Sequence, residues 1–99
     1  METCLCKVFN ESGILFSGPC VVIGHYVGNM DGVNDPEYTF YNGLDNSGDE
    51  YIPTNPIDAS AKGLNGAMQG VKVRYPDGCY VEMSAQTDIS IAVLWKPVS

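Results

Sequence analysis

Short apolar stretches, separated by turn residues, recur along the whole chain. Residues 3–9 and 14–17 are two such stretches, and Asn-Glu-Ser-Gly at residues 10–13 separates them. Residues 20–27 form the longest run of apolar and β-branched residues. Runs of this length and composition, bounded by turn residues, are typical of β-strands. The first third of the chain therefore predicts three strands.

The middle of the chain is more polar and contains fewer clear elements. Residues 28–36 are rich in Gly, Asn and Asp and predict a loop, whereas residues 37–41, Glu-Tyr-Thr-Phe-Tyr, alternate as a half-buried strand does. Residues 42–50 are polar, and residues 51–52 predict a short strand. Two glycines interrupt the apolar residues of 57–69, so no helix is assigned to that segment.

Residues 70–84 predict a β-hairpin. Pro76 and Asp77 suit the centre of a type I turn, and Gly78 suits the left-handed position that follows it. The register that follows pairs Tyr75 with Cys79, Arg74 with Tyr80, Val73 with Val81, Lys72 with Glu82, and Val71 with Met83. The valines and Met83 would then be buried on one face, with Lys72 and Glu82 as an opposite-charge pair on the other.

Together these segments predict an all-β protein: a small antiparallel β-sandwich of the jelly-roll or immunoglobulin-like kind. About seven or eight short strands, at a spacing of roughly 8–12 residues, favour this class. The 99 residues make a single domain, 1–99. A chain of this length buries about 60–65% of its unfolded surface, which is enough for one core.

The last predicted strand, residues 88–95, is apolar on both faces. Four alternating residues, Ile89, Ile91, Val93 and Trp95, fill one face. The other face carries Ser90, Ala92 and Leu94, where a strand facing water normally carries polar residues. We therefore expect Ala92 and Leu94 to be covered, either by a loop of the same chain or by a neighbouring subunit.

The charge balance excludes several kinds of partner. Twelve acidic residues against five basic ones give a formal net charge of −7, so we expect no nucleic-acid ligand. No apolar run reaches the length of about 18 residues that spans a bilayer, so no membrane partner is expected.

Residues 1–7 lack the basic and apolar segments of a signal peptide, which predicts synthesis in a cytoplasm.

The four cysteines do not show the spacing of a metal site. Cys4 and Cys6 form one close pair, but Cys20 and Cys79 stand alone and the chain has one histidine, His25. Structural zinc usually requires two close pairs. We expect four reduced, metal-free thiols, with zinc and a disulfide as the alternatives.

No catalytic, cofactor-binding or metal-ligating residues are predicted, and the chain is not expected to be an enzyme. His25 has no nucleophile near it in sequence. Acidic side chains gather in two loop regions, at Asp31, Asp35 and Glu37 and at Asp45, Asp49 and Glu50. The first group could ligate calcium but lacks the residue order of calcium-binding loops, so solvated acids are the simpler interpretation.

The order of turns and strands resembles the small β-sandwich virion proteins of tailed bacteriophages. The matching residues are Ser12-Gly13, Gly18-Pro19, a strand ending near Val27, Tyr38-Thr39-Phe40-Tyr41-Asn42-Gly43, Ser47-Gly48, Gly78-Cys79-Tyr80-Val81 and Thr87-Asp88-Ile89-Ser90-Ile91. The resemblance covers about residues 12–95, and the loop at 28–36 and the cysteine-rich N-terminus lie outside it.

The resemblance implies a capsid decoration (cement) protein that binds capsomer junctions of the major capsid protein, often as a trimer. Its location would be the virion, assembled in the host cytoplasm. The alternatives are a receptor- or carbohydrate-binding head domain of a fibre, which needs an exposed aromatic platform near loop acids, and a small enzyme or enzyme inhibitor.

Overall fold

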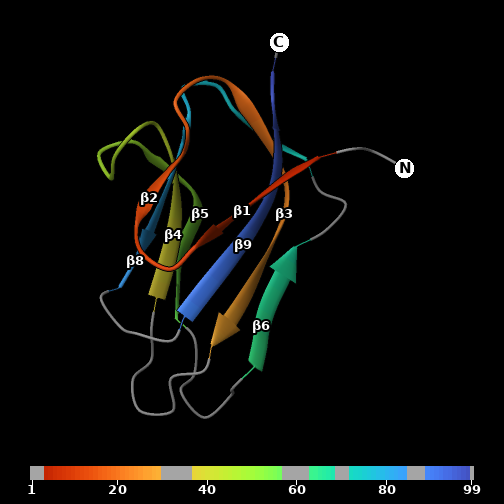
Figure 1. Cartoon of the computed structure of the whole chain (residues 1–99). Coiled ribbons are helices and arrows are strands. Elements are labelled where there is room, and N and C mark those ends of the chain that lie inside the picture. The colour runs from red at the N-terminus through yellow and green to blue at the C-terminus, as the bar shows by residue number, and fades with distance from the viewer. Residues whose placement is uncertain (1–3, 30–36, 57–62, 69–71, 85–88, 99) are drawn as a thin grey trace.

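The computed structural model describes residues 4–29, 37–56, 63–68, 72–84 and 89–98 and contains two facing β-sheets (Figure 1). All elements of the described residues are strands, and every strand pair is antiparallel, which confirms the predicted small β-sandwich. The strands are β1 (Leu5–Phe9), β2 (Gly13–Phe16), β3 (Cys20–Asn29), β4 (Glu37–Asn42), β5 (Asp49–Pro56), β6 (Gly63–Met68), β7 (Val73–Tyr75), β8 (Cys79–Met83) and β9 (Ile89–Pro97).

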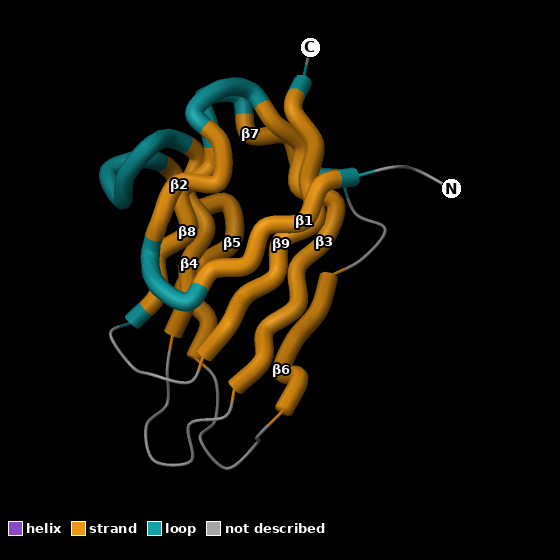
Figure 2. Tube along the Cα trace, in the orientation of Figure 1, coloured by secondary structure: helices purple, strands orange, loops and turns teal. Residues whose placement is uncertain are grey.

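Most strands that are neighbours in sequence lie in different sheets; the exceptions are β4 and β5, which pair in one sheet, and β6 and β7, which both pair with β3 in the other (Figure 2). Sheet A has the order β1-β9-β3-β6, and β7 pairs with β3 on the same side as β6. Sheet B has the order β2-β8-β4-β5. No helix long and apolar enough to span a bilayer is found in the described part of the chain.

The predicted strands are found with shifted ends. The predicted strand at 20–27 continues to Asn29 as β3, and the one expected at 51–52 is the longer β5. The segment 57–69, to which no element was assigned, contains β6. β5 includes Pro53 and Pro56, which cannot donate to a ladder, and it tolerates them because it lies at the edge of sheet B.

The predicted hairpin at 70–84 is wrong in its pairing, although its turn is in place. β7 pairs with β3, with Tyr75 opposite Cys20, whereas β8 lies between β2 and β4 and has no free side. Glu82 accordingly lies opposite Thr39 and not opposite Lys72. The chain crosses from one sheet to the other at residues 76–78. Val71 lies outside the described residues.

Both strands of the failed hairpin alternate correctly, which explains the error. Val81 and Met83 are buried as predicted, and Val73 packs against the same core from the other sheet. Tyr75 and Cys79 are both fully buried on either side of the crossing. Alternation identifies which face of a strand is buried. Strands of both sheets in a sandwich show the same alternation, so it does not show which sheet a strand joins.

Gly78 makes the crossing possible. Its φ of 119° is one that glycine adopts at low cost. A Cβ at this position would lie 2.9 Å from the Phe16 carbonyl oxygen and 2.9 Å from the Leu44 side chain. The Gly78 carbonyl accepts a hydrogen bond of 3.0 Å from the Gly43 amide, so the crossing is held against the β4–β5 loop.

The core fills the space between the sheets. Its fifteen buried apolar residues are Phe9, Leu15, Cys20, Val22, Val27, Tyr38, Phe40, Ile52, Tyr75, Cys79, Val81, Met83, Ile91, Val93 and Trp95. The Phe16 and Trp95 rings, from different sheets, have centroids 5.1 Å apart. Both sheets thus contribute alternate residues to one core.

His25 is buried in this core and joins the sheets. Its Nε2 is 3.0 Å from the Tyr38 hydroxyl on β4, and its ring centroid is 5.1 Å from that of Phe40. Nδ1 has no hydrogen-bond partner among the described residues. Burial lowers the pKa of His25, so the neutral imidazole is the form that the core holds.

Candidate functional site: the outer faces of the two sheets

The outer face of sheet A is apolar at its centre. Cys6 lies opposite Leu94, and Ala92 lies between Val8 on one neighbouring strand and Tyr26 on the other. Directly opposite residues of a sheet share a face, and Ile91 and Val93 of the same strand are buried inside. We call these five residues, Cys6, Val8, Tyr26, Ala92 and Leu94, the apolar face.

Two of the five residues of the apolar face, Ala92 and Leu94, were predicted from the sequence, and the three on the flanking strands were not. Ala92 and Leu94 do lie on the outer side of β9, and both are half-buried. A central strand is flanked on both sides, so partial burial of its outward residues does not require a covering subunit. At the edge of the sheet Val8 is 56% exposed. The contributions of β1 and β3 depend on register, which alternation within one strand cannot give.

Charge is divided between the two sheets. The described strands of sheet A contain three basic residues, Lys7, Arg74 and Lys96, and no acidic one. Those of sheet B contain four acidic residues, Glu37, Asp49, Glu50 and Glu82, and no basic one. Arg74 and Lys96 both lie opposite Val21, so two cations stand at one end of the outer face of sheet A.

The outer face of sheet B combines aromatic and acidic residues. Tyr41 lies opposite Tyr80, and their ring centroids are 6.2 Å apart. Ile14 lies opposite Tyr80 on the β2 side, and Glu50 lies opposite Tyr41 on the β5 side. We call this row, with Glu82 beside it, the tyrosine face.

Glu82 is held in place on the tyrosine face. One carboxylate oxygen accepts a hydrogen bond of 3.3 Å from the Tyr41 hydroxyl, and the other accepts one of 2.9 Å from Asn46 Nδ2. Loss of solvent contact, followed by the nearby Glu82 carboxylate, raises the pKa of Tyr41. The phenol therefore stays protonated and continues to donate.

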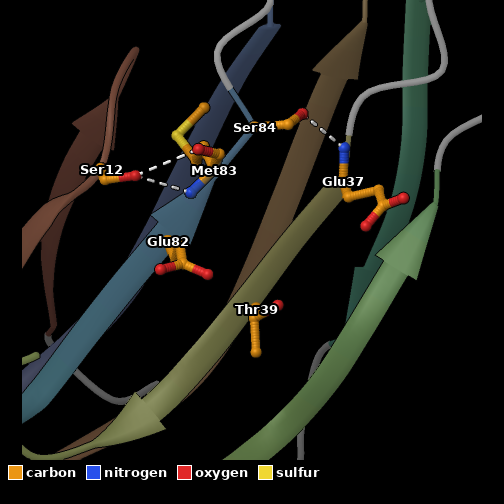
Figure 3. Close-up of a pocket in the computed structure, with 6 residues that line it drawn as sticks. All are labelled: Ser12, Glu37, Thr39, Glu82, Met83 and Ser84. Carbon is orange, nitrogen blue, oxygen red and sulfur yellow. Dashed lines mark hydrogen bonds between the residues drawn. The ribbon is translucent and has the colours of Figure 1, made fainter. Parts of the chain in front are cut away.

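A hollow of about 260 Å³ lies at the end of this face, where β4 and β8 meet the start of β2 (Figure 3). Its described lining residues are Ser12, Glu37, Thr39, Glu82, Met83 and Ser84. They supply hydroxyl groups and carboxylates, and this described lining includes no imidazole or amine that could act as a base at neutral pH.

The two serines of the hollow form hydrogen bonds to the backbone of neighbouring strands at one end of sheet B. Ser12 Oγ donates to the Met83 carbonyl at 3.2 Å and accepts from the Met83 amide at 2.8 Å. Ser84 Oγ accepts from the Glu37 amide at 2.8 Å, and the Ser84 amide donates to the Glu37 carbonyl at 2.9 Å. Ser12 thus holds the start of β2 against Met83, and Ser84 extends the pairing of β8 with β4 by one residue; Figure 3 shows the Ser12–Met83 and Ser84–Glu37 hydrogen bonds. The Ser12 hydroxyl thus both donates to and accepts from the backbone of Met83.

The other predicted candidates do not converge on a site. Asp31 and Asp35 lie outside the described residues, and Glu37 lines the hollow. Asp45 accepts hydrogen bonds from the amide and hydroxyl of Ser47, which lower its pKa. Within the described segments, no three side chains of His, Cys, Asp or Glu are grouped as metal ligands.

The cysteines occupy two different environments. Cys6 is exposed and Cys4 half-buried at the N-terminal end, whereas Cys20 and Cys79 are buried in the core. Burial raises the pKa of Cys20 to about 11 and raises that of Cys79 as well. Because the thiolate is the reactive form, the two core thiols are unreactive while the protein is folded. The redox state of all four in solution stays a prediction.

Comparisons with family models, with curated proteins and with solved structures found no match to this chain.

Proposed function

We propose that this protein is a structural virion protein of a tailed bacteriophage, a capsid decoration protein that binds the major capsid protein through the apolar face. The observation that carries the proposal is the apolar face itself, an uncharged surface over β1, β9 and β3. An apolar surface rimmed by polar residues is typical of a protein–protein contact.

The charge division supports one orientation on the shell. The cations of sheet A, Arg74 and Lys96, stand beside the apolar face, so the shell surface that fits is apolar with acids at its rim. The acidic sheet B would then point away from the shell. A chain with a net charge of −7 gains nothing from contact with the packaged genome.

The sandwich suits a role that needs stiffness and no chemistry. Residues of both sheets share one core, and the sheets are further joined by the His25–Tyr38 contact. A rigid body that contacts several shell subunits at once adds modest contacts by multivalency. Cementing of capsomer junctions requires this property and no catalytic group.

Binding to purified empty capsids tests the proposal. Leu94→Glu places a charge at the centre of the apolar face and should weaken binding by about tenfold to a hundredfold. Ile14→Glu is the matched control, because Ile14 is an apolar residue, 41% exposed, on the opposite sheet. Equal binding by both variants and the wild type, with circular dichroism unchanged, would refute the proposal.

A receptor- or carbohydrate-binding function is the second candidate, and the tyrosine face favours it. Tyr41 and Tyr80 supply aromatic rings beside the carboxylates of Glu50 and Glu82. Sugar rings stack on aromatic side chains, and their hydroxyl groups donate to carboxylates. Binding of a glycan panel by the wild type, with loss in Tyr80→Ala and retention in Leu94→Glu, would favour this function over the first.

A further inference from the structure

The four edges of the two sheets differ in how they are guarded against pairing with another strand. β5 carries two prolines and pairs with β4 through two register shifts. β2 has a bulge between Ile14 and Phe16. On the far edge of sheet A, β6 is bulged against β3, and β7 is only three residues long with an exposed Arg74. Prolines, bulges, short length and charge are the usual protections of an edge strand.

β1 has no proline and no bulge, and Lys7 is its one charged residue. Its five residues pair with β9 in unbroken register from Leu5 to Phe9, and it contains no proline and no glycine. Leu5 is 51% exposed and Val8 is 56% exposed. In the part of the chain that the structure describes, β1 pairs with β9 on one side only. A regular strand with a free edge and exposed apolar side chains is a template for strand addition.

The one charge on β1 is directed elsewhere. Lys7 Nζ donates a hydrogen bond of 3.1 Å to the Ile14 carbonyl of β2 and lies 5.2 Å from the Phe9 ring centroid. Lys7 therefore covers the edge of sheet B, and its ammonium is held over its own chain. The edge of β1 is left without a charge that points outward along the sheet.

We infer that β1 pairs with β1 of a second copy of this chain, antiparallel and about a two-fold axis, so that the two A sheets become one. The inference adds a partner to the proposed function and rests on a different surface, the edge of sheet A. Residues 4–9 contain no acid, so two copies that each carry a net charge of −7 meet where they repel least.

The sequence of β1 selects one register. A two-fold axis keeps the outer faces on one side, so residues of the same parity must lie opposite each other. One register overlaps all five residues of β1 and places Lys7 opposite Lys7 of the second copy. The other overlaps residues 4–8, which extend β1 by one residue at its start, and places Cys6 opposite Cys6. Like charges directly opposite are destabilising. The second register is therefore favoured, with Leu5 opposite Lys7 and Cys4 opposite Val8.

Light scattering of the free protein over a hundredfold range of concentration tests the pairing. The wild type should show twice the monomer mass at the high end. Cys6→Lys places two lysines opposite each other and should remain monomeric, whereas Cys6→Ser, at the same exposed position, should remain dimeric. A monomer mass at every concentration would overturn the inference. So would the mass of a trimer, which is the assembly that the phage resemblance implies.

The register is tested with dibromobimane, which joins two thiols a few ångströms apart. In a Cys4→Ser background, Cys6 is the one thiol outside the core, and it should give a covalent dimer. In a Cys4→Ser, Cys6→Ser background, Val8→Cys should give none, because position 8 does not face itself in this register. A dimer joined through position 8 but not 6 would overturn the register.

These results are independent of the proposed function. Strand pairing is measured on the free protein, and shell binding is measured with capsids and depends on Leu94. A protein that is monomeric and binds capsids would refute the strand pairing alone. A protein that forms the dimer through Cys6 and does not bind capsids would refute the decoration role alone. Leu94→Glu should lose capsid binding and keep the dimer, because Leu94 points out of the sheet and not along its edge.

Discussion

The two sheets are alike on their inner faces and opposite on their outer ones. Inside, each presents alternate apolar residues such as Ile91 in sheet A and Phe40 in sheet B, both fully buried. Outside, sheet A carries an apolar surface with cations at one end, and sheet B carries tyrosines among carboxylates. The inner faces are constrained by packing, so the difference between the outer faces is where a function can be encoded.

This difference also separates two kinds of binding. The apolar face offers burial of hydrophobic area to a protein surface, whose stabilisation grows with the area removed from water. The tyrosine face offers hydrogen-bond acceptors, and Glu82 already has both oxygens engaged within the chain. The first surface therefore fits a protein partner better, and the second fits a small polar ligand.

Truncation of inner residues should have the largest effect and should be alike in the two sheets. Phe40→Ala should lower the free energy of unfolding by about 3–5 kcal/mol, and Ile91→Ala by about 2–5 kcal/mol, because each leaves a cavity in the same core. Urea unfolding followed by circular dichroism measures both. A loss below about 1 kcal/mol for either variant would mean that its sheet does not share the core.

The crossing between the sheets should be nearly as sensitive. Gly78→Ala forces a side chain into a left-handed backbone and against the Phe16 carbonyl, and should cost about 1–3 kcal/mol. Gly28→Ala is the control, since its Cβ would meet nothing closer than 4.0 Å and its backbone is that of a strand. In thermal unfolding, Gly78→Ala should melt at a lower temperature than Gly28→Ala. Equal melting temperatures would contradict the geometry of the crossing.

Acid should weaken the contact between the sheets through His25. Burial lowers its pKa below the ordinary value of 6.5, so the unfolded chain binds a proton that the folded chain does not. Stability should therefore fall as the pH drops below 6.5, by up to about 1.4 kcal/mol for each pH unit until the folded pKa is reached. Urea unfolding between pH 7.5 and 5, at closely spaced pH values, measures this slope.

The double variant His25→Leu, Tyr38→Phe isolates that slope. It removes the titrating ring together with its hydrogen-bond partner, so no buried hydroxyl is left alone. The variant should lose the part of the pH dependence that begins near pH 6.5. An unchanged slope would assign the acid sensitivity to other groups.

Substitutions on the outer faces should have the smallest effect on folding. Leu94→Ser and Tyr80→Ser should each change the free energy of unfolding by about 0.5–1 kcal/mol, because both residues are only half-buried. The same urea titrations provide the comparison. A loss of several kcal/mol for Leu94→Ser would show that the apolar face is part of the core and is not available to a partner.

Much of the fold could be predicted from alternation and turn residues. The strands around Phe9, Val22, Phe40, Val81 and Val93 lie where the pattern placed them. β6 was missed because Gly63 and Gly66 weaken the strand signal, and its pairing with β3 is a tertiary effect. The strands that pair with β7 and β8 could not be predicted. Alternation of buried and exposed residues along a strand does not show which of the two sheets the strand belongs to.

The candidate surfaces were harder to predict than the strands. Leu94 was identified because its strand is apolar on both sides, which one sequence can reveal. Val8 and Tyr26 join it only through the register of three strands. The pairing of Tyr41 with Tyr80 likewise joins residues that are far apart in sequence. Surfaces built across strands depend on register, and register is a property of the folded sheet.

Hydroxyl-radical footprinting of the protein, free and bound to empty capsids, tests the central claim most directly. Oxidation is read residue by residue by mass spectrometry. The account predicts that Val8, Tyr26 and Leu94 lose labelling on binding, while Tyr41 and Tyr80 are labelled as in the free protein. Protection of Tyr41 and Tyr80, with Val8 and Leu94 unchanged, would contradict it and assign the contact to sheet B.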